Sequence, residues 1–164
     1  MAVTWDGYSE SELFMNNNIS NVIAQYIPGL LSRGKLHCCS LGFDECILSD
    51  GFPRFIVYRD REGVSVSYLK INRNKYNEYQ IGHFLLLRRN VLPLGSSGYR
   101  TDGLQGMDLK CVEDLLWYEH ALLSAGQDIL SGDDRWLLDY PWNPIPVADL
   151  KVTLIERAMS NDKL

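Results

Sequence analysis

The first apolar pattern of this chain has helical spacing. Its steps of three and four residues predict one apolar helix face, formed by Ile19, Val22, Ile23, Tyr26, Ile27 and Leu30. Ser9 and Glu12 have the spacing of a capping box and predict an earlier helix start, whereas the asparagines at 16–18 favour a break or a restart. Pro28 is expected to kink or end this helix, and Gly34 is a suitable stop.

The middle of the chain has the pattern of strands. Residues 54–59 are rich in β-branched and aromatic side chains, and residues 64–68 alternate apolar with polar positions. Residues 60–63 lie between them and end in Gly63, which can adopt positive φ, so a hairpin is predicted. A third strand is expected over 83–88, and an earlier one over 35–41 or 45–48.

Helical spacing returns in the last third. One stripe over residues 109–130 consists of Cys111, Leu115, Tyr118, Leu122, Ala125 and Ile129. If this stripe faces inward, the outer side of the helix presents Glu113, Trp117, His120 and Asp128. A last helix is expected from about Pro146 to Met159, since proline suits a first helical turn.

These elements predict an α+β fold. We expect a small antiparallel sheet of about three to five strands, packed with an N-terminal helix and C-terminal helices. The length of 164 residues suits one globular domain. Within it we expect a sheet-rich part at 35–92, a glycine-rich loop at 93–107 and a helical part at 108–160.

Charge is sorted along the chain. Residues 51–101 carry nine Lys/Arg and three Asp/Glu, whereas residues 102–164 carry five Lys/Arg and twelve Asp/Glu. Residues 1–50 carry two and six, which gives the whole chain a net charge of −5. An acidic chain argues against sequence-independent nucleic-acid binding, because that binding needs a basic surface.

Location and cofactors follow from what the sequence contains. No apolar run approaches the roughly 18–20 residues that span a bilayer. The first twelve residues are acidic and polar, unlike a secretory signal, so we expect a cytoplasmic protein without a membrane partner. No motif indicates a cofactor, and none is expected.

The cysteines and histidines give no catalytic or metal motif. Cys38 and Cys39 are adjacent, so their side chains point to opposite faces of a strand, and His37 and Cys46 do not complete a zinc spacing. We expect all four cysteines, including Cys111, to be reduced and mostly buried.

Acidic and aromatic residues lie together near the C-terminal end of the predicted helix. Asp133, Asp134 and Asp139 surround Trp136 in the sequence. Such a cluster is either a capped helix end followed by core aromatics or a binding surface, in which aromatic area gives affinity and acids steer a basic partner.

Two stretches of this region resemble small bacterial immunity proteins. They run from Glu113 to Tyr118 and from Asp128 to Trp136, and the likeness covers about 25 residues: an amphipathic helix followed by an acidic Gly-Asp turn. The resemblance implies a cytoplasmic, non-enzymatic inhibitor that binds a cognate toxin domain, often a basic nuclease, and blocks its active site.

The sequence-based prediction is therefore a protein-binding module, with an immunity protein as its leading form. The partner-binding residues that we predict are Glu113, Trp117, Asp128, Asp133, Asp134, Trp136 and Asp139. One alternative is an enzyme with a hidden site, built from His37, Cys39, His83 and His120. Another is an adaptor whose basic residues share one sheet face: Arg54, Arg59, Arg61, Arg73, Lys75, Arg88 and Arg89. The oligomeric state is left open.

Overall fold

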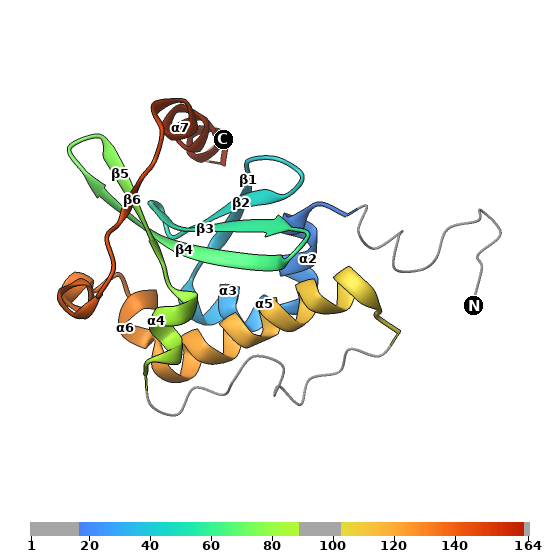
Figure 1. The fold of residues 1–164 in the computed structure, drawn as a ribbon. Helices are drawn as coiled ribbons and strands as arrows, with labels where there is room; N and C mark the ends of the chain where they lie inside the picture. Colours follow the sequence, from blue (N-terminus) through green and yellow to red (C-terminus); the bar gives the residue numbers. More distant parts are fainter. Residues whose placement is uncertain (1–16, 89–102, 163–164) are drawn as a thin grey trace.

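The computed structural model describes residues 17–88 and 103–162. Its centre is one antiparallel sheet in which the strands follow one another in chain order (Figure 1). The strands are β1 (His37–Ser40), β2 (Glu45–Ser49), β3 (Pro53–Asp60), β4 (Gly63–Asn72), β5 (Lys75–Gln80) and β6 (Ile145–Pro146). The sheet therefore grows through neighbouring hairpins until the chain returns with β6 beside β5.

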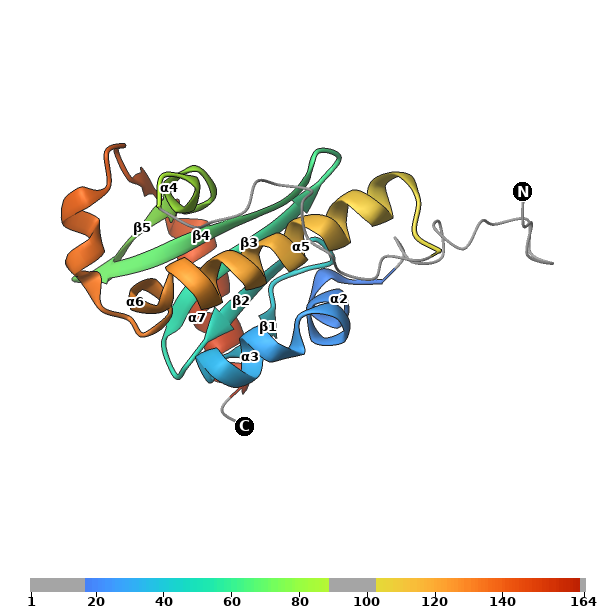
Figure 2. The ribbon, with the colours of Figure 1, turned by 90° about the horizontal axis from the view of Figure 1, so that it is seen from below.

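Helices cover both faces of the sheet, but unequally. The larger layer consists of α2 (Ile19–Tyr26), α3 (Pro28–Gly34), α4 (Gly82–Leu86), α5 (Gly106–Ala125) and α6 (Gln127–Leu130). Figure 2 shows α5 lying along the sheet as the longest element of this layer. The opposite face carries α7 (Asp149–Asp162), which Figure 1 places on the other side of the strands.

The alternation of side chains along the strands creates two cores. Phe55 and Val57 of β3 belong to the main core under the helical layer, whereas Ile56 packs with Ile155 and Met159 of α7. A strand places successive side chains on opposite faces, which is why one strand supplies both cores. None of the described helices is long and apolar enough to cross a membrane.

The N-terminal apolar stripe forms helices as predicted, in two pieces. Asn18 caps α2, and its side chain accepts a hydrogen bond from the Asn21 backbone at 2.9 Å. Pro28 ends this run by starting α3, which ends at Gly34. The proposed capping box at Ser9 and Glu12 lies outside the described residues.

The predicted hairpin is confirmed, but the predicted third strand is wrong. β3 pairs with β4 in the register Asp60↔Gly63, with residues 61 and 62 as the turn. Residues 83–88 begin within helix α4, which buries Phe84 and Leu85. The strand is instead β5, whose polar sequence escapes detection because most of its residues are partly or fully exposed.

Within the described residues the sheet has six strands, so the expected three to five was too few. Both alternatives for an early strand form, as β1 and β2, and they pair with each other. The two-residue β6 adds a short edge beside Asn77 and Glu78. Such a short strand carries no periodicity that a sequence could reveal.

Two helix boundaries also differ from the prediction. The stripe over 109–130 is divided at Gly126 into α5 and α6, and a Cβ at Gly126 would lie 3.0 Å from the Leu122 backbone. Pro146 belongs to β6, and α7 begins only at Asp149. Most of the predicted loop at 93–107 lies outside the described residues.

Candidate functional site

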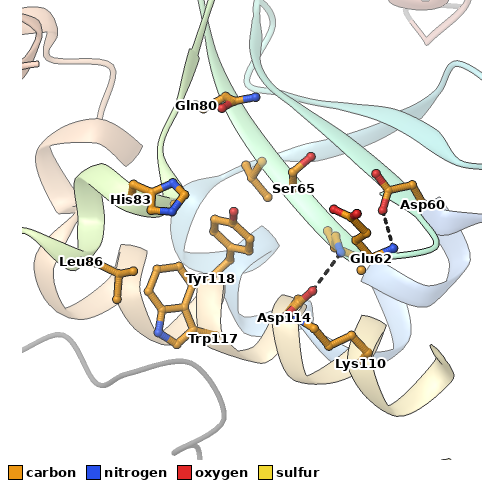
Figure 3. Close-up of a pocket in the computed structure, with 14 residues that line it drawn as sticks. Asp60, Glu62, Ser65, Gln80, His83, Leu86, Lys110, Asp114, Trp117 and Tyr118 are labelled. Atoms are coloured by element: carbon orange, nitrogen blue, oxygen red, sulfur yellow. Dashed lines mark hydrogen bonds and ion pairs between the residues drawn. The ribbon is translucent and has the colours of Figure 1, made fainter. Parts of the chain in front are cut away.

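A pocket of about 410 Å³ opens where β5 leaves the sheet. Three elements surround it: the β3–β4 hairpin end, α4 and α5 (Figure 3). In Figure 3, Trp117 and Tyr118 of α5 lie between α4 and the β3–β4 hairpin end. Its volume is within the range of about 300–1,000 Å³ that is common for ligand pockets.

The pocket lies where β4 extends beyond the residues that pair with β5. β5 pairs with β4 only from Ser67 onward, and Gln80 is the last paired residue. The Ile81 backbone N–H then donates to the Val66 carbonyl at 3.2 Å, and α4 begins. The first part of β4, residues 63–66, is therefore paired with β3 on one side and borders the pocket on the other.

Two side chains of α5 bind the backbone of this half-paired segment. The Val64 N–H donates to the Asp114 carboxylate at 2.9 Å. Burial raises the pKa of Tyr118 to about 12, against the effect of a hydrogen bond with the Val66 backbone. Asp114 and Tyr118 are four residues apart on α5, which is a rise of about 6 Å, and Val64 and Val66 are two residues apart on β4, which is about 6.6 Å. The two side chains therefore have nearly the same spacing as the two backbone groups. Asp114 and Tyr118 thus protect an edge that would otherwise be open to pairing.

The two ends of the pocket differ in chemistry. Asp60 and Glu62 lie at one end, beside Asp114 and Lys110, and His83 and Leu86 lie at the other (Figure 3). We call Asp60 and Glu62 the acidic end. The Lys110 ammonium pairs with Asp114, whereas neither carboxylate of the acidic end has an ion pair within the described residues.

Exposed apolar side chains lie at and beside the end of the pocket that His83 and Leu86 form. Leu86 and Leu87 are 41% and 66% exposed, and Trp142 is 45% exposed. The Trp142 ring lies against His83, with 6.4 Å between the ring centroids. We call His83, Leu86, Leu87 and Trp142 the α4 rim. The pocket thus joins an acidic end to an apolar rim, a combination common in protein interfaces.

Of the residues that line this pocket, sequence reasoning named as candidates only Trp117, for partner binding, and His83, for a hidden enzyme site. It assigned Asp60 and Glu62 only to a hairpin turn and gave Asp114 no role. The available signal was the acidic composition of that turn, together with Gly63 and the acidic helix position 114. That signal does not reveal that β5 stops early, and it is this tertiary feature that creates the pocket.

The predicted acidic cluster is largely neutralised within the chain. Asp128 pairs with Arg88 at 2.6 Å, and a hydrogen bond from Arg88 lowers the pKa of Asp128. Hydrogen bonds from Arg135 lower the pKa of Asp133 to about 2. These carboxylates already have cationic partners, so they are weaker attractors for a basic protein than the sequence implies.

Asp134 is neutralised by contacts with side chains of β4. It forms an ion pair with Lys70 and accepts a hydrogen bond from the Tyr68 hydroxyl at 2.7 Å. Partial burial acts to raise the pKa of Asp134, but the hydrogen bonds from Lys70 and Tyr68 outweigh it, so the pKa lies below its usual value. This aspartate ties the η1 helix (Asp134–Asp139) to β4.

The two predicted tryptophan anchors are not surface residues. Trp117 is 2% exposed and Trp136 is 3% exposed. The expectation that Trp117 faces outward is wrong because α5 lies between the sheet, α2, α3 and α4 and buries more than one stripe. Trp136 packs edge-on to Tyr68, with centroids 5.1 Å apart, so its aromatic neighbours form a core.

The other two predicted residues remain accessible. Glu113 is half-buried on α5, and Asp139 is exposed at the end of η1. Their contact with a partner stays a prediction. Neither of them lines the pocket.

The described basic residues of segment 54–100 do not share one face. Arg59 is buried, with its guanidinium donating to Asp44 at 2.8 Å, and Arg54 pairs with Asp50. Arg61 lies at one end of β4 and Arg73 at the other, about 33 Å apart for ten strand residues. Lys75 lies with Arg73, Arg88 pairs with Asp128, and Arg89 lies outside the described residues. The predicted basic stripe is therefore wrong.

The groups proposed for a hidden enzyme site are dispersed. His83 lines the pocket, but His37 and Cys39 are on β1 and His120 is on α5 outside the pocket lining. The four cysteines are unbridged, and three of them are buried. Residues 17–88 and 103–162 contain no cluster of three metal-binding side chains.

A buried carboxylate lies apart from the pocket, at the start of α5. Asp108 is 1% exposed, and neither of its oxygens accepts a hydrogen bond in the described part of the chain. Burial raises the pKa of Asp108 to about 6, although the charge of Arg59 acts to lower it. This carboxyl group therefore binds its proton more tightly in the folded chain than in the unfolded chain.

We expect Asp108→Asn to stabilise the protein at neutral pH. Between about pH 4 and 6 the folded state holds more protons than the unfolded state, so wild-type stability falls as pH rises through this window. The neutral amide removes that loss, and the variant should gain about 1–2 kcal/mol in free energy of unfolding at pH 7.5. Urea denaturation of both proteins at pH 4 and 7.5 measures it. An equal difference at both pH values would contradict the assignment to ionisation of Asp108.

Comparison with known protein families, curated proteins and solved structures finds no match for this chain.

Proposed function

We propose that this protein is a non-enzymatic binding module that recognises a basic protein through the acidic end and the α4 rim. A toxin-neutralising immunity protein is the form of this function that we favour, as the resemblance of residues 113–136 implies. The observation that carries the proposal is the pocket, where two carboxylates that form no ion pair within the described residues lie near the exposed apolar side chains of the α4 rim.

The chemistry of this surface suits a protein partner. Apolar and aromatic side chains such as Leu87 and Trp142 supply contact area, and an exposed group of this kind commonly marks an interface. The carboxylates of Asp60 and Glu62 add attraction for a cation and accelerate encounter. The net charge of −5 acts in the same direction over longer distances.

Affinity capture from the native host lysate at low and moderate salt tests the proposal. We expect one stoichiometric basic protein, identified by mass spectrometry, whose recovery falls as salt rises. With that partner purified, Glu62→Lys should weaken binding about tenfold or more, mainly through faster dissociation, because the change places a cation inside the contact.

Glu156→Lys is the matched control. Glu156 is exposed on α7, on the opposite face of the sheet, and its substitution changes the net charge by the same amount. It should slow association slightly through the long-range field and leave dissociation unchanged. Equal loss of affinity in both variants would show that net charge alone matters and would refute this surface. Capture of no protein at either salt concentration would refute the function.

A further inference from the structure

The half-paired segment of β4 is not available for an added strand. A peptide that extended the sheet here would need the backbone groups of Val64 and Val66 that point away from β3. The Asp114 carboxylate accepts from the Val64 N–H at 2.9 Å, and the Val66 carbonyl accepts from the Ile81 N–H at 3.2 Å. A ligand of this pocket therefore contacts it with a side chain rather than by backbone pairing.

The charge of the pocket lining favours a cation. Three carboxylates line it, from Asp60, Glu62 and Asp114, against one ammonium group, from Lys110. Lys110 and Asp114 neutralise each other, so no cationic side chain within the described residues pairs with the acidic end. One oxygen of Asp60 accepts from the Glu62 backbone at 2.7 Å, whereas its second oxygen and the Glu62 carboxylate have no hydrogen-bond partner among the described residues and can bind a ligand.

Further acceptors border the same space. The Val64 N–H points away from β3, and in an antiparallel pair the carbonyl of the same residue points to the same side. The Ser65 hydroxyl and the Gln80 amide also line the pocket. A guanidinium has five N–H donors in one plane and can bind carboxylates and neighbouring carbonyls together, whereas an ammonium has three donors around one nitrogen and no planar fork.

We propose that the pocket receives one arginine side chain of the protein partner, with its guanidinium at the acidic end. The apolar stem of the arginine lies along Val64 and Leu86, and the partner backbone stays outside, against the α4 rim. The pocket volume of about 410 Å³ leaves room for this side chain and part of its neighbour. The inference rests on the proposed function and specifies the group that the partner inserts.

A titration with arginine and its neutral analogue tests this assignment. Nα-acetyl-arginine methylamide is added to isotopically labelled wild-type protein, and backbone amide shifts are followed by NMR. Nα-acetyl-citrulline methylamide, which has the same shape without charge, and Nα-acetyl-lysine methylamide serve as comparison ligands. We expect the arginine compound to shift the amides of Glu62, Gly63 and Ser65 with a dissociation constant of about 1–20 mM, as suits a single side chain.

The variants make the test specific. Glu62→Gln should weaken arginine binding at least about threefold, whereas Glu156→Gln on α7 should leave it unchanged. Citrulline should give no saturable shift. The arginine assignment is overturned if lysine binds as well as arginine, if citrulline matches it, or if the shifts lie away from the hairpin.

The two proposals can fail separately. If a captured partner is sensitive to Glu62→Lys but the arginine compound does not bind, the surface is an interface and the arginine assignment is wrong. If the arginine compound binds at the hairpin but no basic protein is captured, the pocket chemistry stands and the proposed function is wrong.

Discussion

Trp136→Ala is expected to lower the free energy of unfolding by about 3–5 kcal/mol, as is usual when a buried tryptophan is truncated. Trp136 is 3% exposed and lies at the centre of an aromatic group with Tyr68, Tyr79, Phe84 and Tyr140. Its removal leaves a cavity among four rings that belong to separate elements, so little collapse can fill the space. Urea denaturation followed by circular dichroism measures the loss.

Trp142→Ala is the matched control for this prediction. Trp142 is 45% exposed and touches Tyr140 and His83 at the surface. Its truncation should cost less than about 1 kcal/mol, as is usual for an exposed position. If Trp136→Ala proved as stable as Trp142→Ala, the burial of Trp136 would be wrong, and its role as a partner contact would become open again.

The two tryptophans illustrate what a sequence can say about an aromatic residue. Trp136 lies near three aspartates and Trp142 near three prolines, only six positions apart in the same short segment. Their difference arises because η1 places Trp136 against Tyr68 of β4, a contact across 68 positions of the chain. The pattern could predict that aromatics gather here, but it could not separate core from surface.

Elements with strong local patterns were predicted well. The hairpin was predictable because its turn and both strands are continuous in the sequence, and its strands are rich in β-branched and aromatic residues. The stripe of α2 was predictable because one face of that helix packs inward. By contrast, neighbouring elements contact α5 on several sides, so it buries Asp114 and Trp117 as well as its leucines. The single apolar stripe predicted from the sequence therefore includes only part of its buried surface.

The candidate site was less predictable than the fold. The sequence does not show which carboxylates form ion pairs. Asp128 pairs with Arg88, which is 40 positions away, and Asp134 pairs with Lys70, which is 64 positions away. Charge counted along the chain therefore pointed to aspartates that are neutralised in three dimensions. Asp60 and Glu62, the pocket carboxylates without a cationic partner among the described residues, lie in the segment that the sequence marks as basic.

Gly63→Ala is expected to cost about 3–4 kcal/mol in stability, from two contributions of about 1–3 kcal/mol each: backbone strain and an unsatisfied buried N–H. Gly63 has φ of +126°, which an L side chain rarely adopts, and a Cβ at this position would lie 2.0 Å from the Asp114 carboxylate. Relief of that clash requires the hairpin end to separate from α5, which breaks the buried hydrogen bond between Val64 and Asp114. Urea denaturation of the variant and the wild type measures the loss.

Gly51→Ala separates these two contributions, because Gly51 has φ of +104° but a Cβ at this position would meet no atom within 4 Å. It should cost about 1 kcal/mol, from the backbone alone. In an Asp114→Ala background, Gly63→Ala should likewise fall to about that value, since the clashing carboxylate is gone and the two substitutions are then strongly non-additive. Additive losses would mean that Gly63 acts only through its own backbone. Non-additivity would show that the acidic end is held against α5 by Asp114, and that the pocket and the stability of the hairpin depend on the same contact.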